Sequence, residues 1–337
     1  ASGQIKYSEI IAEFGTPNSG GIGEYRISEN VGSLTNLPLD TGVPQSGQIK
    51  FSDFYSKKLN QIVDLHSIGN NTSRQNAKDR WNNGNVHIVG STKTGKTQPP
   101  DTIDDRVIIN VNATIASAKG TQTHCALRTG TWDSNTTLEI EIGTSGKLFG
   151  SGGDGGTGGS ANETPGTDGQ TGSSALGIQY PCTINNLGVI QSGYGGGGGG
   201  GGNTRTTGGG KKGGATTNGS SGGGGGGGAG SPAGSAGGVS TPLSQGGGSA
   251  GSAGQAGSLS GQATGGAGGS EAGAGGNSSP VNNSATKADD GATASGAASP
   301  GTGGNNGYAI ITNQGSAPSL SGGGTLTGRT ITSTNPT

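Results

Sequence analysis

The sequence has almost no excess of charge of either sign. Lys and Arg total 19 and Asp and Glu total 20, which gives a formal net charge of −1. Without a basic excess the chain has little to neutralise phosphates with, so nucleic acid is not expected as a partner. The balance also argues against a solvated, disordered tail, which normally combines low hydrophobicity with high net charge.

Long apolar runs are missing as well. No stretch approaches the roughly 18 apolar residues of a membrane-spanning helix, so membrane insertion is not expected. The chain contains no Met, and its first residues, ASGQIKYSEI, lack the charged-then-apolar pattern of a secretion signal. We therefore expect a protein made in a cytoplasm without a secretion signal.

Residues that carry chemistry are scarce. The two cysteines, Cys125 and Cys182, are expected to be small buried hydrophobes rather than a disulfide. With three histidines in the chain, no four-ligand metal spacing emerges, and Asp101, Asp104 and Asp105 lack the spacing of a calcium loop. Neither a metal nor another cofactor is expected. No paired-carboxylate site is evident, so an enzyme, for example a surface depolymerase, is not expected either.

One segment, Gly90 to Thr97, matches the phosphate-binding pattern G-x-x-x-x-G-K-T after a strand-like run. That loop must continue into a helix whose N-terminus faces the phosphates. Here Gln98, Pro99 and Pro100 follow at once, and a proline pair continues such a helix poorly. We interpret the segment as a β-turn loop.

Glycine is what the sequence has in excess: 79 of 337 residues, including eight in a row at Gly195 to Gly202 and seven at Gly222 to Gly228. Glycine loses much backbone entropy on ordering and has no side chain to bury. Ordered polyglycine must therefore gain its stability from the backbone. Chains in the polyproline II conformation, packed side by side, can do so through N–H···O bonds to their neighbours.

Other glycine-rich architectures fit less well. Collagen requires strict Gly-X-Y and abundant proline, whereas these glycines are consecutive and Pro totals 13. A flexible Gly/Ser linker and an extracellular wall or silk-like protein are the remaining alternatives. We predict a polyglycine II helix bundle over residues 150–307, with a strand insert at 175–192.

The remainder predicts a mostly β fold. Residues 1–60 form a small N-terminal unit with an internal repeat, because Ser2 to Ile10 reads almost the same as Ser46 to Phe54. Each copy predicts a short strand that leads to a helix capped by Ser8 or Ser52. The repeats are expected to dock on another protein or on each other, and a self-contained domain is the alternative. Strand-like runs make 61–149 a β-solenoid or sandwich-like layer, and 308–337 supplies closing strands.

Two sets of residues are candidates for binding. Apolar residues of the repeats would contact a partner protein: Ile5, Tyr7, Ile49, Phe51 and Phe54. Spacers between glycine runs would be displayed as loops on a rigid frame, where binding residues tend to lie. The candidate receptor-binding residues in these loops are Asn203, Thr204, Arg205, Lys211, Lys212, Leu243, Gln245, Asn282 and Asn283.

Two passages resemble bacteriophage proteins. Ser46 to Phe54, SGQIKFSDF, looks like segments of phage tail-associated proteins, including those of cyanobacterial phages. Ile184 to Tyr194, opening into eight glycines, resembles the glycine-rich tail-fibre tip adhesins of T-even-like phages, and that likeness covers about residues 150–320. The resemblance implies a polyglycine II sandwich whose loops recognise the bacterial surface.

The favoured hypothesis is thus a phage tail or fibre adhesin, located in the virion tail and assembled in the host cytoplasm. Its partners would be other phage tail or virion proteins, through residues 1–60, and a host surface receptor that is a protein or a polysaccharide. The alternative is a purely structural virion protein, such as a fibre segment or capsid decoration, that binds no receptor.

Overall fold

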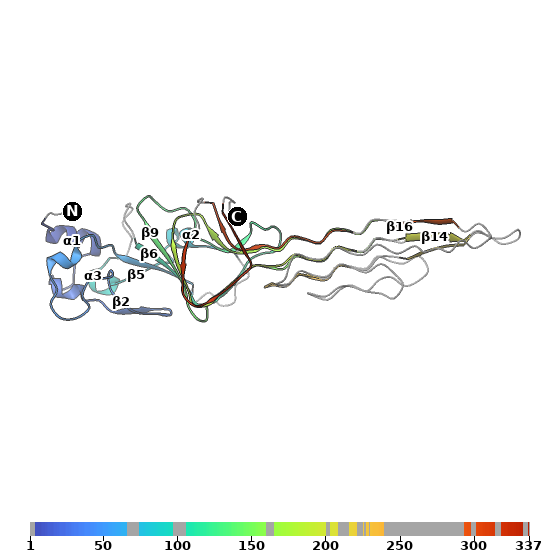
Figure 1. Ribbon diagram of the computed structural model, residues 1–337. Coiled ribbons are helices and arrows are strands. Elements are labelled where there is room, and N and C mark those ends of the chain that lie inside the picture. Colours follow the sequence, from blue (N-terminus) through green and yellow to red (C-terminus); the bar gives the residue numbers. More distant parts are fainter. Residues whose placement is uncertain are drawn as a thin grey trace, which may run out of the picture.

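The molecule is elongated in the computed structural model, with an N-terminal unit at one end, parallel strands in the middle and glycine-rich segments running away on the other side (Figure 1). For residues 203–207, 216–220 and 293–297 only the backbone is described. The residues that the structure describes are 4–65, 74–96, 106–159, 165–199, 203–207, 216–220, 225, 227–228, 230–238, 293–297, 301–313, 318–332 and 336.

The two copies of the N-terminal repeat form similar helix starts. A carboxylate reaches back to a backbone amide in each: Lys6 N donates to Glu9 at 2.8 Å and Lys50 N to Asp53 at 2.7 Å. Lys6 and Lys50 are therefore the N-cap residues, and the prediction that Ser8 and Ser52 cap these helices is wrong. The strands predicted before the helices are also not formed by the described residues 4–6 and 46–50.

After these starts the copies diverge. The first continues as α1 (Tyr7–Phe14), and Gly15, at φ 85°, ends it. The second stops after a 3₁₀ helix, Phe51–Phe54. The unit is completed by a 3₁₀ helix at Ile22–Tyr25 and an antiparallel hairpin of β1 (Glu29–Val31) and β2 (Leu34–Leu37).

The repeats dock on each other around a shared aromatic core. Phe54 lies edge-on to Phe14 and Tyr25, with ring centroids 5.6 and 5.3 Å apart. Ile5 N donates to the Tyr55 hydroxyl at 3.0 Å, which joins the two copies through the backbone as well. These edge-to-face contacts bury the Phe54 ring of the second copy against aromatic residues that follow the first copy.

The middle of the chain is a β-solenoid built from three parallel sheets, and β5 is the antiparallel edge strand of the first. The first sheet contains β3 (Asn60–Asp64), β5 (His87–Ile88), β6 (Arg106–Val111), β9 (Thr137–Ile142), β12 (Thr183–Asn186) and β18 (Ser319–Ser321). The second contains β7 (Thr114–Ala116), β10 (Lys147–Phe149), β13 (Val189–Gln191) and β19 (Thr325–Thr327). The third contains β4 (Gln75–Asn76), β8 (Cys125–Arg128), β11 (Ser174–Ile178), β17 (Tyr308–Thr312) and β20 (Arg329–Thr332). Each full turn supplies one strand to every sheet, so of the two predicted β architectures the solenoid is observed.

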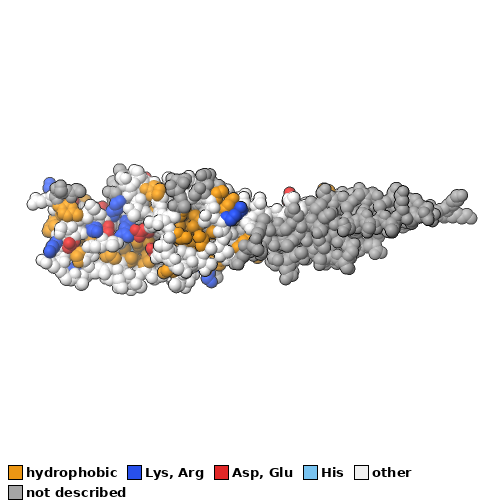
Figure 2. All heavy atoms as spheres, viewed as in Figure 1, with side chains coloured by type: hydrophobic (Ala, Val, Ile, Leu, Met, Phe, Trp, Pro, Cys, Tyr) orange, Lys and Arg blue, Asp and Glu red, His pale blue; other side chains and the backbone are white. Residues whose placement is uncertain are grey.

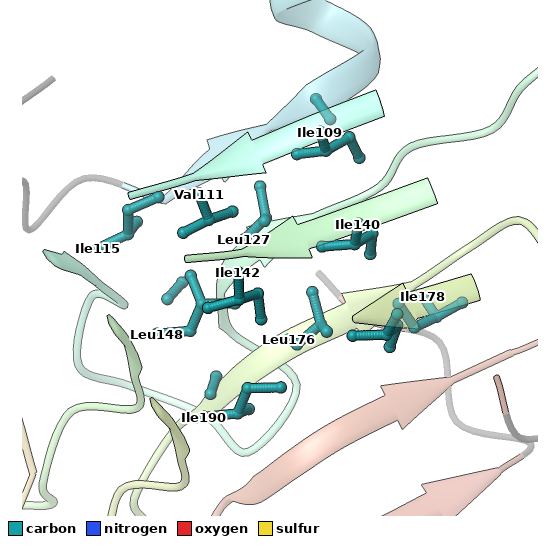
Figure 3. Close-up of a cluster of buried hydrophobic side chains, with 14 of the residues drawn as sticks. Ile109, Val111, Ile115, Leu127, Ile140, Ile142, Leu148, Leu176, Ile178 and Ile190 are labelled. Atoms are coloured by element: carbon teal, nitrogen blue, oxygen red, sulfur yellow. The ribbon is translucent and has the colours of Figure 1, made fainter. Parts of the chain in front are cut away.

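Ladders of like side chains fill the solenoid, as Figure 3 shows. Because the sheets are parallel and in register, equivalent residues of successive turns lie directly above one another. One ladder per sheet illustrates this: Ile109–Ile140–Ile184, Ile115–Leu148–Ile190 and Leu127–Leu176–Ile310. A slip of one residue would turn a whole ladder outward, so the apolar pattern fixes the register.

The N-terminal unit and the solenoid share the first sheet. On β3, Val63 points into the solenoid core while Ile62 packs into the core of the N-terminal unit. On β6, Ile109 packs into the solenoid core and Ile108 into the core of the N-terminal unit, which explains why apolar residues follow one another on that strand. Both faces of the sheet are therefore covered at this end.

An ion network reinforces the junction. The Arg106 guanidinium binds Glu139 through Nε at 3.1 Å and Nη2 at 2.8 Å. Its Nη1 donates to the Thr41 hydroxyl at 2.6 Å and lies 3.5 Å from the Asp40 carboxylate in the N-terminal unit. The planar fork of arginine suits this bidentate geometry and ties the two units together.

The two cysteines are free thiols. Cys125 is fully buried on β8, and Cys182 packs against the solenoid core. Burial raises the pKa of each thiol to about 12, so both remain protonated at neutral pH. They behave as the small hydrophobes that the sequence predicts.

Candidate functional site: the glycine bundle and the N-terminal surface

All glycine-rich segments leave the solenoid at the same corner, where the chain passes from the second sheet to the third. In the first full turn this corner is the short connection 117–124 between β7 and β8. In the next turns it expands to 150–173 between β10 and β11, and to 192–307 between β13 and β17. The bundle is thus a set of insertions that start from one place on a rigid frame.

Serines line that corner. Ser117, Ser151 and Ser173 are fully buried, and their hydroxyls contact one another. Ser151 N donates to the Ser173 hydroxyl at 2.7 Å and to the Ser117 hydroxyl at 3.1 Å. Buried polar groups need such partners, so these serines hold neighbouring segments of the chain together where the solenoid ladders end.

Beyond the corner, backbone hydrogen bonds recur at every third residue. The segment 193–199 donates from Gly193, Gly196 and Gly199 to the carbonyls of Ser173, Gln170 and Thr167, at 2.8 to 2.9 Å. The segment 301–307 donates to 193–199 with the same spacing, from Gly301, Gly304 and Gly307. A repeat of three residues is the period of the polyproline II conformation and differs from the two-residue period of a β-strand.

Segment 193–199 is surrounded by other segments. Besides the bonds to 167–173 and 301–307, its carbonyls at Tyr194 and Gly197 accept from Gly153 and Gly156. A Cβ on Gly196 would lie 2.1 Å from the Asp154 carbonyl oxygen, far inside the allowed contact distance. By contrast, a Cβ on Gly238 would meet no described atom closer than 4.0 Å. Glycine is therefore required at Gly196, whereas Gly238 has room for a side chain among the described residues.

Carboxylates bind neighbouring segments together. Asp154 accepts from the Lys119 ammonium and the Ser235 amide, each at 2.6 Å, and Asp168 accepts from the Thr302 amide at 2.7 Å. Burial raises the pKa of Asp154, but these hydrogen bonds outweigh it and hold the pKa below its usual value. The backbone and hydroxyl hydrogen bonds of Thr302 lower the pKa of Asp168.

These lowered pKa values predict acid sensitivity of the bundle. A carboxyl whose pKa falls on folding adds stability above its unfolded pKa of about 3.9, and that stability is lost as pH drops through the folded value. We expect the melting temperature of the wild type to fall more steeply below about pH 4 than that of the Asp154→Asn, Asp168→Asn double variant. At neutral pH the double variant should be less stable by about 1 kcal/mol. Identical acid profiles in thermal unfolding would contradict this role.

The far end of the bundle carries a small antiparallel sheet of order β15-β14-β16 (Figure 1). Its strands are β14 (Asn203–Thr207), β15 (Thr216–Ser220) and β16 (Thr293–Ala297). Three candidate receptor-binding residues, Asn203, Thr204 and Arg205, therefore lie on a strand instead of in a loop. The other six lie outside the described residues: Lys211, Lys212, Leu243, Gln245, Asn282 and Asn283.

The candidate attachment residues lie at the opposite end. Phe54 and Ile49 are buried, at 2% and 8% exposure, and Ile5 packs against the same core. Phe51 is 43% exposed and lies edge-on to the partly buried Tyr7, with ring centroids 6.1 Å apart. The surface that a partner can contact thus contains Tyr7 and Phe51. Side chains of both charges lie among hydrophobic ones on the face of this unit seen in Figure 2.

The phosphate-loop pattern has a structural role instead. Ser91–Thr94 forms the one-turn helix α3, which corrects the predicted β-turn. Gly90 N donates to the Glu29 carboxylate at 3.1 Å, and Lys96 Nζ donates to the Ala12 carbonyl at 2.6 Å. A carboxylate and a backbone carbonyl thus take the donors that a phosphate would need, and the segment locks onto the N-terminal unit.

Other chemistry is sparse in the described part of the chain. No group of three or more His, Cys, Asp or Glu residues there could hold a metal ion. None of the helices described is both long enough and apolar enough to cross a membrane. The predicted acidic loop at 101–105 lies outside the described residues.

A parallel solenoid with a glycine bundle at one corner defines an elongated, mostly β protein. Residues 78–331 match the family model described as phage tail fibre adhesin Gp38, and the chain belongs to that family. The match begins after the N-terminal unit and is wider than the passage that carries the resemblance in the sequence.

Among solved structures, the crystal structure of the gp37-gp38 adhesin tip complex of the bacteriophage S16 long tail fiber is similar at 18% identity. The similarity covers 86% of this chain and 90% of that chain, with a TM-score of 0.36. No curated protein matches the sequence.

Proposed function

We propose that this protein caps a phage tail fibre, attaches to it through the N-terminal unit and recognises the host cell surface with the far end of a polyglycine II bundle. The observation that carries the proposal is the arrangement of the insertions. They start from one corner of the solenoid, pack with a three-residue period, and hold the sheet of β14, β15 and β16 away from the N-terminal unit. Family membership supports the role of adhesin.

The arrangement also favours an adhesin over a purely structural spacer. A spacer needs length and stiffness, which the packed segments already supply. The antiparallel sheet adds a second kind of structure at the end of the bundle, with two Thr-rich strands. Individual contacts made there can be weak, because several fibres on one virion bind the same cell and multiply the affinity. Non-catalytic recognition is thus sufficient for host attachment.

Binding to cells tests the recognition proposal. We expect the labelled protein to bind saturably to a few strains in a panel of bacteria. Replacing 203–207 and 239–245 by Gly/Ser spacers should reduce that binding at least tenfold, because 203–207 is the central strand of the sheet that we propose meets the receptor. Leu326→Ser, a change at an exposed residue of the solenoid, serves as the control and should bind like the wild type. Saturable binding that the spacer variant retains would contradict the proposal.

A further inference from the structure

A cavity of about 280 Å³ lies beside the tip of the β1–β2 hairpin, on the outer face of the first solenoid sheet. Ser33 and Leu34 of the hairpin form one wall. Asn112 and Leu187, which follow β6 and β12, lie with Glu141 of β9 among its other lining residues. The cavity is therefore built jointly by the N-terminal unit and the solenoid, far from the glycine bundle.

A polar ladder runs through the cavity wall. Asp64, Asn110, Glu141 and Asn185 are paired in register on adjacent strands and share the outer face, and Asn110 and Glu141 line the cavity. Asn110 is fully buried and donates to Asp64 at 3.0 Å and to the Val31 carbonyl at 3.3 Å, while its own carbonyl accepts from Ser33 at 2.9 Å. These bonds fix the ladder before any ligand arrives, which lowers the entropic cost of binding.

Glu141 offers an acceptor to a ligand. Asn185 donates to its Oε2 at 2.8 Å, whereas no hydrogen bond joins Oε1 to any residue that the structure describes. Burial and the nearby charge of Glu139 raise the pKa of Glu141, although the Asn185 hydrogen bond opposes them. A half-buried carboxylate with an open acceptor position can accept a charge-assisted hydrogen bond from a ligand hydroxyl.

The apolar and charge character of the lining narrows the ligand class. Leu187 lines the cavity with a side chain that is 49% exposed, and Leu34 of the hairpin lines it as well. Among the residues that the structure describes, no basic side chain lines the cavity, which disfavours phosphates and acidic ligands, and the one carboxylate found there is too few for a hard cation. Hydroxyl donors combined with an apolar C–H face are the features of a sugar ring.

We propose that this cavity binds one neutral sugar residue. Glu141 would accept from ring hydroxyls, Asn112 and Thr144 would supply further polar contacts, and Leu34 and Leu187 would cover the C–H face. The site is separate from the bundle and independent of the receptor proposed there. An adhesin with such a site could hold a surface polysaccharide along its side as its tip meets the receptor.

Saturation-transfer NMR on the full chain tests the proposal with free glucose, galactose, mannose, rhamnose and N-acetylglucosamine. At least one sugar should bind saturably with a Kd of about 1 mM, typical of so small a ligand. Glu141→Gln should weaken binding about tenfold, through loss of a charge-assisted hydrogen bond. Leu187→Ser should weaken it several-fold, whereas the matched Leu326→Ser should leave it unchanged.

Three results would overturn the proposal. They are no saturable binding of any of the five sugars, binding that survives both cavity variants, or equal loss in Leu326→Ser. Thermal unfolding of each variant separates a lost site from a lost fold, and Leu187→Ser removes a half-exposed side chain, so it should fold normally. Because the sugars are tested without cells, failure here leaves the receptor proposal standing.

Discussion

Replacing Gly196 by alanine is expected to destabilise the glycine bundle by about 3 kcal/mol, the upper end of the range for overpacking. The new Cβ would lie 2.1 Å from the Asp154 carbonyl oxygen and 2.4 Å from its carbon. Both are backbone atoms held by hydrogen bonds on either side, so no rotamer change relieves the clash. The segments would have to separate, and the bonds from Gly193, Gly196 and Gly199 to 167–173 would weaken together.

Hydrogen exchange measured by mass spectrometry would show this directly. Amides of 193–199 and 167–173 should exchange faster in Gly196→Ala, while those of the solenoid strands stay protected. Gly238→Ala is the matched control, since its Cβ meets no atom closer than 4.0 Å and alanine restricts the unfolded chain. If the two variants unfold alike, the packed arrangement around 193–199 is not the one described.

The sequence predicts this architecture where the physical cause is local. β9 alternates apolar and polar residues, and it forms a strand with one face buried. A glycine follows the helical run of α1, and Gly15 ends that helix at a positive φ that favours glycine. The run from Gly195 implies close packing, because only glycine tolerates it. Such features depend on residues that are close together in the sequence, so the sequence alone predicts them.

Other features depend on contacts between distant residues. Residues 150–173 and 192–307 are separate insertions in the sequence. Both start from the same corner of the solenoid, because its successive turns stack in register. The buried Phe54 and the exposed Phe51 belong to one motif, and only the docking of the two repeats decides which ring is inside. The cavity at Glu141 likewise exists only after the hairpin lies on the solenoid.

The short helices between residues 61 and 149 are not predicted from the sequence, because each contains too few residues. The sequence predicts only β structure between 61 and 149, but α2 (Ala77–Asn82) forms there. The Asn76 side chain accepts from Lys78 N at 3.1 Å and from Asp79 N at 3.4 Å, which is an N-cap that could have been recognised. Six residues are too few to produce a clear helical periodicity, so the cap was the only available signal.

Replacing both Tyr7 and Phe51 by serine is expected to reduce attachment to the tail fibre at least about 30-fold, the loss of roughly 2 kcal/mol that defines a binding hot spot. The exposed Phe51 lies against Tyr7, which is partly buried on the core of the unit, and the Tyr7 hydroxyl donates to the Gly20 carbonyl at 2.9 Å, which orients its ring. Preorganised aromatic side chains lose little entropy on binding and bury large areas.

The measurement uses phage particles that lack this protein. Purified wild type or variant is added, and the bound fraction is read by co-sedimentation and by the recovery of infectivity. Leu326→Ser, which removes an exposed hydrophobic side chain of the solenoid, should attach like the wild type. The double variant should melt at nearly the wild-type temperature, because the aromatic core of Phe14, Tyr25 and Phe54 is untouched. Normal attachment by a folded Tyr7→Ser, Phe51→Ser variant would place the fibre contact on another face of the N-terminal unit.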